Sequence, residues 1–378
     1  MNEVSEILVS NQSPLDESHQ RLGAVVTERD GWSVPASYGD VLLEYAAVRE
    51  GGVGLIDLSS RGRLLVGGSE AVQFLNGLIT NDMKTLAENQ WMPAVFPTVQ
   101  GRLIASVRVI HTGDGYLIDT EPATHGRVLQ TVARFTLAGD FRVTDLTTEM
   151  AQLSLQGLRA AKIAGDVFGD SAESLSNFAG AVVPWNNSQV TIIRATHTAA
   201  DGFDLFVEAS AAATLWEKLT AAGARPIGFD AFEILRIEAG QPRYGIDMDE
   251  TNVVTETNLD EAISYTKGCY IGQEIVARIK YRGHVAKKLT GLLFARGVKV
   301  QTGATIRSLD EKDIGRITSA TLSPHLGRTL ALGYVKYDYL AAGTSVKVVA
   351  GDQEFTAEVT ELPFVHASWD LDLRQGDA

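Results

Sequence analysis

The residue whose chemistry stands out is the single cysteine, Cys269, which lies in the segment KGCYIGQE at residues 267–274. A helix-like run begins directly after this segment, at Ile275. A thiol just ahead of a helix N-terminus and close to a lysine ionises readily, because the helix dipole and the ammonium group both favour the thiolate. Gly268 and Gly272 let the backbone approach a ligand closely or adopt a positive φ. The pattern favours a reactive thiol, and a small buried apolar residue is the alternative.

The surroundings of Cys269 are basic although the chain as a whole is acidic. Residues 267–288 hold six lysines and arginines against one acid, a local charge of +5, whereas all 378 residues together carry −14. Such a concentration favours a landing site for an anion, namely a phosphate, a carboxylate-bearing ligand or an acidic partner. A solvated helix face with surface ion pairs is the alternative. The candidate motif and anion-binding residues are Lys267, Gly268, Gly272, Gln273, Glu274, Arg278 and Arg282.

Other kinds of site are disfavoured by composition. One cysteine forms no internal disulfide, which indicates a reducing compartment, and it does not by itself hold an iron–sulfur cluster. The seven histidines are scattered without a metal-binding spacing, so no built-in metal is expected. The net charge argues against strong general binding to nucleic acids or anionic membranes. With no signal-like N-terminus and no long uncharged apolar run, we expect a soluble cytoplasmic protein without a membrane segment.

The elements that must hold these residues follow two patterns. Residues 1–37 show little periodicity and predict a loosely attached N-terminal arm. Residues 38–284 alternate strands with helices, which predicts an α+β region of two intertwined lobes, with approximately 61–145 as one lobe. Residues 285–378 predict a C-terminal antiparallel β-barrel. Its expected strands are 289–294, 304–308, 314–320, 331–335, 345–349 and 354–360.

Several segments together resemble a known family. The runs RIEAGQPRYG (236–245), DMDET (247–251) and KGCYIGQE, followed by YRGH (281–284), resemble the YgfZ group, which comprises folate-binding relatives of the glycine-cleavage aminomethyltransferase, or T-protein. The resemblance spans residues of about 38–360 in order. Supporting matches are GLIDLSSRGRLLVGG (54–68), FLNGLITNDM (74–83), DGFDLFVEA (201–209) and GRITSAT (315–321).

The resemblance implies a T-protein-like ring of three lobes, two α+β and one β-barrel, with tetrahydrofolate in a central channel. Asp204 matches the acidic position that hydrogen-bonds the pterin ring, and Tyr265 matches an aromatic wall position. Arg236 and Tyr244 belong to the motif that lines the lobe interface, where simple packing is the alternative role. These four residues are therefore the expected folate-binding residues.

One departure from the family pattern bears on the reaction. True aminomethyltransferases resemble GGxxDD at the strand that corresponds to residues 101–106, and an aspartate there assists reaction at the folate nitrogen. This chain has Ala105 and Ser106 at the two acidic positions. Neither side chain does the proton-transfer work of a carboxylate, so aminomethyl transfer by the usual route is disfavoured.

Three functions follow from this reasoning. The favoured hypothesis is a non-enzymatic, tetrahydrofolate-binding accessory protein that supports iron–sulfur cluster assembly or repair, including for tRNA-modifying radical enzymes. Its partners would be iron–sulfur enzyme clients, and Cys269 would be its reactive thiol. The alternative is a tetrahydrofolate-dependent aminomethyl- or methyltransferase. The third is an interaction module whose basic stretch, 278–288, docks an acidic protein or tRNA.

Overall fold

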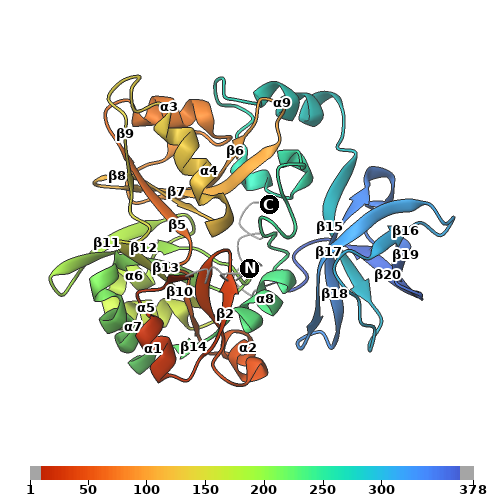
Figure 1. Ribbon diagram of the computed structural model, residues 1–378, viewed down its shortest axis with the longest axis horizontal. Coiled ribbons are helices and arrows are strands. Elements are labelled where there is room, and N and C mark those ends of the chain that lie inside the picture. The colour runs from red at the N-terminus through yellow and green to blue at the C-terminus, as the bar shows by residue number, and fades with distance from the viewer. Residues whose placement is uncertain (1–9, 367–378) are drawn as a thin grey trace, which may run out of the picture.

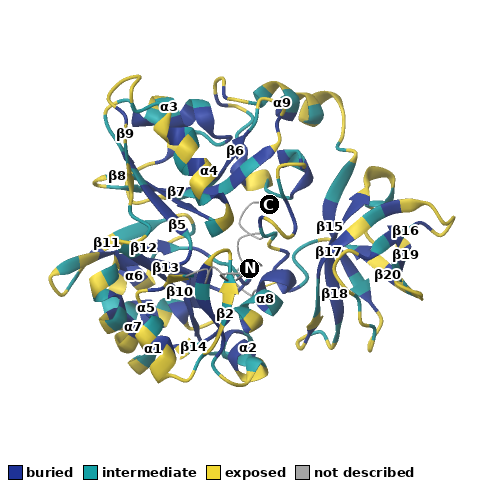
Figure 2. Cartoon of the chain, viewed as in Figure 1, coloured by how far each residue is buried: buried dark blue, intermediate teal, exposed yellow. Residues whose placement is uncertain are grey.

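The computed structural model describes residues 10–366, which form three lobes and a small N-terminal sheet (Figure 1). Two of the lobes are α+β and lie one above the other in the view, and the third is a closed barrel beside them. Buried residues run through all of the sheets, while the outward faces of the helices are exposed (Figure 2). This confirms the predicted fold class of an α+β protein with a C-terminal antiparallel barrel.

The N-terminal segment is packed onto the lower lobe rather than loosely attached. Leu15 is fully buried, and the ring of His19 lies 5.2 Å from that of Trp216. His19 Nε2 is 2.8 Å from the buried Asp57 Oδ2, and the Tyr38 hydroxyl is 2.7 Å from His19 Nδ1. Weak periodicity did not reveal these few anchoring contacts. The segment contains β1 (Asn11–Gln12), α1 (Asp16–Arg21), β2 (Val25–Arg29) and β3 (Trp32–Ser37), in the sheet order β1-β3-β2.

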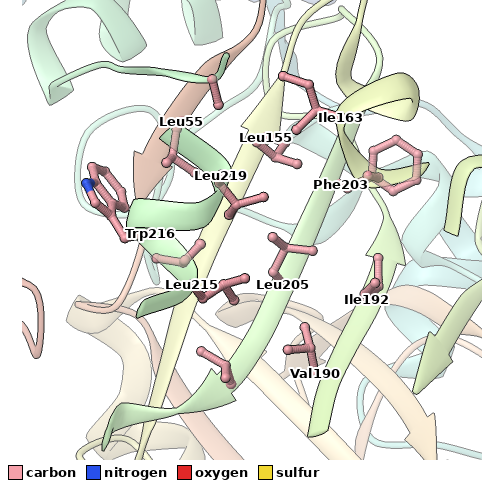
Figure 3. Packing of buried hydrophobic residues seen from close by; sticks show 14 of the residues in the cluster. Leu55, Leu155, Ile163, Val190, Ile192, Phe203, Leu205, Leu215, Trp216 and Leu219 are labelled. Atoms are coloured by element: carbon pink, nitrogen blue, oxygen red, sulfur yellow. The ribbon is translucent and has the colours of Figure 1, made fainter. Parts of the chain in front are cut away.

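The lower lobe is built on a six-stranded sheet with helices on both faces. Successive residues of a strand point to opposite faces, so Leu55 joins one apolar core and Ile56 the other. Figure 3 shows Leu215, Trp216 and Leu219 of one helix lying over the strands of the first core. The sheet order is β11 (Gly180–Trp185), β12 (Ser188–Arg194), β13 (Gly202–Glu208), β10 (Met150–Gln156), β4 (Gly54–Asp57), β14 (Arg225–Pro226). The helices are α5 (Ala160–Phe168), α6 (Asp170–Glu173) and α7 (Ala212–Ala221) at the first core, with α2 (Val41–Arg49) and α8 (Phe229–Glu238) at the second.

The upper lobe is a five-stranded antiparallel sheet whose apolar face is closed by two helices. Leu75, Phe96 and Val128 are among the fully buried residues of its core. The sheet order is β6 (Trp91–Pro97), β7 (Leu103–Thr112), β8 (Gly115–Thr120), β5 (Gly62–Gly67), β9 (Arg142–Asp145), and the helices are α3 (Ala71–Leu78) and α4 (Pro122–Ala133).

The barrel closes on itself, so its strands leave no free edge. The order around it is β15 (Lys287–Phe294), β18 (Arg328–Lys336), β17 (Asp313–Ser323), β16 (Thr305–Arg307), β19 (Ser345–Ala350), β20 (Gln353–Thr360). These strands lie where the sequence predicts them. A long connection crosses from the lower lobe through the upper lobe to the barrel, with the short helices η3 (Val254–Glu256) and η4 (Asp260–Ala262) and the helix α9 (Gln273–Arg282). The remaining short helices are η1 (Met83–Thr85), η2 (Ala209–Ala211) and η5 (Tyr337–Tyr339).

Candidate functional site

A cavity of about 960 Å³ lies where the lobes meet. Ser106 and Arg108 of β7 line it from the upper lobe, and His197 and α8 line it from the lower lobe. Residues 288–290 and 361–363 close it from the barrel side, and Arg29 reaches it from the N-terminal hairpin. Its size is that of a site for a ligand such as a cofactor.

A buried network of charges forms one wall of this cavity. Arg108 donates from Nε to Asp119 Oδ2 at 2.7 Å, and its Nη2 lies 2.5 Å from Asp204 Oδ2. Arg61 donates to Asp119 Oδ1 at 2.7 Å and to Glu121 Oε1 at 2.8 Å. Burial alone would raise the pKa of Asp119 and of Asp204, but the adjacent guanidinium groups hold both well below the usual range. Both carboxylates are therefore ionised at neutral pH.

His197 connects this network to the open space. Its Nε2 lies 2.9 Å from Asp204 Oδ2, and its side chain, 18% exposed, lines the cavity. Asp204 itself is fully buried behind this wall and also accepts a hydrogen bond from Gln152 Nε2 at 3.1 Å. A carboxylate in this position fixes the orientation of the imidazole. The pair is therefore suited to accept and return a proton inside the cavity.

Aromatic rings and unusual backbone conformations mark the same cavity. Trp91 and Phe178 lie 5.0 Å apart at its wall, and Arg108 lies over the Trp91 ring at 5.8 Å. Phe178 has φ +62° and Ala199 has φ +58°, which is a strained conformation for residues with a side chain. Such strain persists where the surroundings enforce it, and it gathers at functional sites.

The predicted folate-binding residues fall into two groups. Arg236 lines the cavity, and Asp204 lies directly behind its wall. Tyr244 and Tyr265 are not among the cavity-lining residues. The Tyr244 hydroxyl donates to Glu250 Oε2 at 3.1 Å, and burial raises the pKa of Tyr244 to about 12. The folate contacts of all four predicted residues stay predictions.

Arg236 is held rigidly between two elements. Its guanidinium pairs with Asp247 and with Glu233, and its Nη2 donates to Ser319 Oγ of the barrel at 2.6 Å. Asp247 in turn accepts from Thr318 Oγ1 at 2.6 Å. Arg236 thus packs at the interface and also lines the cavity, and its contact with folate stays a prediction.

Lys267 is turned inward and does not face solvent. Its ammonium donates to the carbonyl oxygens of Asn76, Ile79 and Asn81 at 2.7, 2.9 and 2.6 Å. An ammonium group has three N–H donors, so none is left for an anionic ligand. Burial lowers the pKa of Lys267 to about 8. This geometry corrects the anion-binding expectation for Lys267: it pins the cysteine loop to the end of α3.

The rest of the motif lies around the start of α9, outside the lining of the cavity. Gly272 has φ +80°, as predicted, and a Cβ there would lie 2.4 Å from the Thr98 carbonyl oxygen. Gly268 has open space around it, so no close approach requires a glycine there. The anion-binding role of the remaining motif residues stays a prediction. Gln273 is the first residue of α9. The exposed residues of the motif and of α9 include Cys269, Glu274, Arg278 and Arg282.

Sequence reasoning missed the charged residues of β7 and β8. In the structure the β7–β8 register places Arg108 opposite Asp119. Opposite charges that face each other across a hairpin are a signal that the sequence offers. Ser106 lines the cavity, whereas Ala105 is buried in the core of the upper lobe. As expected from the sequence, neither position supplies a carboxylate to the site.

No group of three or more histidine, cysteine, aspartate or glutamate residues in the range 10–366 is arranged to hold a metal ion. No helix in the same range is long and apolar enough to span a bilayer.

Two family models cover most of the chain. The model of the GCVT N-terminal domain matches residues 15–267, and that of the glycine cleavage T-protein C-terminal barrel domain matches residues 287–366. The chain also shares the fold of a solved structure, the glycine cleavage system aminomethyltransferase T from Bartonella henselae. The TM-score is 0.87 at 24% identity, with 94% of this chain and 98% of that one covered.

Several curated relatives of similar length are named aminomethyltransferase. The aminomethyltransferase of Rubrobacter xylanophilus is 31% identical over 355 residues, which cover 93% of this chain and 94% of the relative. That of Halothermothrix orenii is 31% identical over 360 residues, which cover 94% and 99%. These names denote enzymes, so they overturn the expectation of a non-enzymatic accessory protein for iron–sulfur clusters and its enzyme clients. Nor do the matches single out the YgfZ group. The chain belongs to the glycine cleavage T-protein family.

Proposed function

We propose that this protein is a tetrahydrofolate-dependent one-carbon transferase of the aminomethyl- or methyltransferase type, and that it works in the central cavity. The observation that carries the proposal is the Arg108–Asp204–His197 wall facing a space of about 960 Å³ between the lobes. Similarity over nearly the full length to aminomethyltransferases supports the reaction class. Aminomethyltransferases of this family use tetrahydrofolate.

The walls fit a flat, partly polar ligand of this kind. Trp91 and Phe178 offer aromatic faces against which a ring packs, while the polar wall beside them fixes its orientation. When bound, tetrahydrofolate supplies the nitrogen that accepts the one-carbon unit. The chain itself must bind and orient the ligand, exclude water and move a proton.

His197 is the residue that we assign to proton transfer. Ser106 stands where the family pattern has a carboxylate, so the proton must be handled elsewhere on the wall. Imidazole is a common general acid–base group, and the buried Asp204 beside it fixes its orientation. In this proposal His197, held by the buried Asp204, does the work that a single carboxylate does in the family pattern.

The test is an assay for 5,10-methylenetetrahydrofolate, or for methyltetrahydrofolate with a methyl donor. The protein is incubated with tetrahydrofolate and an aminomethylated carrier protein or a methylamine donor. We expect turnover by the wild type and a kcat lower by roughly 10²–10⁴-fold in His197→Gln, because general acid–base catalysis contributes about that factor. The pH dependence of kcat should also lose one ionisation.

The chain offers a matched control for this variant. His125 forms a second histidine–aspartate pair, with Nε2 2.8 Å from Asp145 Oδ2, and it does not line the cavity. His125→Gln should keep the wild-type kcat. A wild type that binds tetrahydrofolate but transfers no one-carbon unit from any of these donors would contradict the proposed function.

The same assay examines Cys269. As a reactive residue Cys269 stays a prediction: Cys269→Ala loses turnover if the thiol takes part in the chemistry and keeps it if the cavity wall acts alone. A cytoplasmic location and the lack of strong general nucleic-acid binding likewise stay predictions.

A further inference from the structure

Two arginines on the cavity wall have most of their N–H donors unused. Arg29 ends β2 and Arg243 follows α8, and each side chain is 25% exposed. Among residues 10–366, the Arg29 guanidinium makes no hydrogen bond, and its nearest carboxylate oxygen, Glu233 Oε2, is 3.9 Å away. Arg243 makes one long hydrogen bond to the same oxygen at 3.3 Å, and its Nε is buried without a partner in that range. Each of these arginines therefore has one buried nitrogen, Arg29 Nη1 and Arg243 Nε, without an acceptor in this range.

The charges around this pair leave it positive. Glu233 is shared by Arg29, Arg243 and Arg236. Asp247 is occupied by the other side of Arg236. Two further acids, Asp30 and Asp230, are exposed, so water screens their charges. Burial and the adjacent Arg243 charge lower the pKa of Arg29, as expected where two cations face one carboxylate.

The Arg29 guanidinium and the Arg243 backbone are already held in place. Arg29 pairs with Trp32 in the β2–β3 ladder, and its guanidinium lies over the Phe229 ring at 5.1 Å. Arg243 is fixed at its backbone, because its N–H donates to the buried Asp247 at 3.1 Å. Preorganised arginines lose little conformational entropy when they bind an anion.

We propose that Arg29 and Arg243 form an anion subsite of the central cavity that takes a carboxylate group of the substrate. Guanidinium forks match a carboxylate in geometry as well as in charge. The carboxylate comes either from the glutamate of tetrahydrofolate or from a small amino-acid donor of the one-carbon unit. The subsite rests on the proposed function only in that its ligand enters this cavity.

Binding of three probes tests the subsite without requiring turnover. Calorimetry measures tetrahydrofolate, 6-methyltetrahydropterin, which lacks the glutamate, and N-methylglycine, each with the full-length wild type, Arg29→Gln and Arg243→Gln. We expect Kd for a carboxylate-bearing probe to rise about 10–100-fold in both variants, the usual effect of losing a charge-assisted hydrogen bond. Affinity for 6-methyltetrahydropterin should stay unchanged.

The pattern of losses identifies the source of the carboxylate. Weaker tetrahydrofolate with unchanged N-methylglycine assigns the subsite to the folate tail, and the reverse assigns it to the donor. Arg21→Gln is the control, since Arg21 lies in the same N-terminal segment but pairs with Glu217 on the exposed surface. Thermal unfolding checks that each variant is folded.

Two results would overturn the subsite. One is a wild type that binds no carboxylate-bearing probe, and the other is unchanged affinity for every such probe in both variants. Neither result depends on catalysis. If both variants show the expected losses in binding but the wild type transfers no one-carbon unit, the proposed function is contradicted and the subsite stands.

Discussion

At the scale of single residues, Arg108 decides the electrostatics of the cavity wall. Its guanidinium lies between Asp119 and Asp204, which are both fully buried. Burial alone would lower the pKa of Arg108, but these two carboxylates raise it. A buried carboxylate without a partner would take up a proton instead of staying charged. Arg108 therefore keeps Asp204 in the ionised form that positions His197.

The Arg108→Met variant should be destabilised in a pH-dependent way. In the wild type the folded-state pKa of Asp119 and Asp204 lies below the unfolded value of about 3.9, so their contribution to stability is complete at neutral pH and is lost as pH falls through the folded pKa. In the variant, burial raises the pKa of Asp204 above the unfolded value, so protonation favours the folded state. We expect a loss of about 3–5 kcal/mol at pH 7 that shrinks at pH 5.

Urea unfolding of the wild type and Arg108→Met at pH 7 and pH 5 measures this difference. Arg278→Met, on the exposed face of α9, serves as the control and should show a small loss at both pH values. A deficit of Arg108→Met that is equal at the two pH values would show that Asp204 stays charged without Arg108.

At the scale of elements, the cysteine loop is fixed by one buried lysine. The Lys267 ammonium donates to three carbonyl oxygens of residues 76–81, where α3 ends and its last carbonyls lack helical partners. Gly272 then turns the chain into α9 with φ +80°. The N–H of Ile271 also donates to the carbonyl oxygen of Gly77 at 3.0 Å, so the exposed Cys269 lies between two points at which the loop is bonded to α3.

Replacing the anchor should therefore cost stability. We expect Lys267→Met to lower the free energy of unfolding by roughly 2–4 kcal/mol, because it leaves buried carbonyl oxygens without donors. The control is Lys280→Met, since Lys280 is exposed and its ammonium lies 5.0 Å from the centre of the Tyr265 ring. Chemical denaturation measures both, and equal stabilities of the two variants would refute the anchoring role.

At the scale of the whole molecule, Glu238 joins the lower lobe to the barrel. Its side chain accepts hydrogen bonds from Tyr45 at 2.7 Å, from Arg49 at 2.8 Å and from Ser323 of the barrel at 2.6 Å. Its backbone carbonyl also accepts from the N–H of Phe364 at 2.9 Å. Because the cavity is closed on one side by the barrel, this junction helps to set the shape of the cavity.

The Glu238→Ala variant should weaken the junction. Removing a buried partner leaves the Arg49 charge uncompensated, at a cost of about 3–5 kcal/mol. We expect differential scanning calorimetry to show a lower Tm and a barrel transition separate from that of the two α+β lobes. Glu358→Ala, on the exposed side of β20, is the control. A single transition at the wild-type Tm would contradict this account.

Much of the architecture was predictable because it depends on local pattern. The alternation and turns after residue 285 predicted the six barrel strands, and an alternating α+β pattern predicted the two lobes. Gly268 and Gly272 looked alike in the sequence, because any glycine tolerates a positive φ, and only Gly272 adopts one. The motifs likewise predicted the T-protein family, although they pointed to the wrong branch of function within it.

The sequence by itself thus determined the fold class, the family and the unusual Ala105 and Ser106 positions. Only the tertiary structure decided where the site lies: it brought Arg29, Arg108 and His197 to one cavity and placed Cys269 on the surface outside its lining. It also turned Lys267 inward to carbonyl oxygens 186–191 residues away in the chain. The physical reason is that ion pairing and burial depend on neighbours from distant segments, whereas helix, strand and turn patterns depend on residues that are adjacent in the sequence.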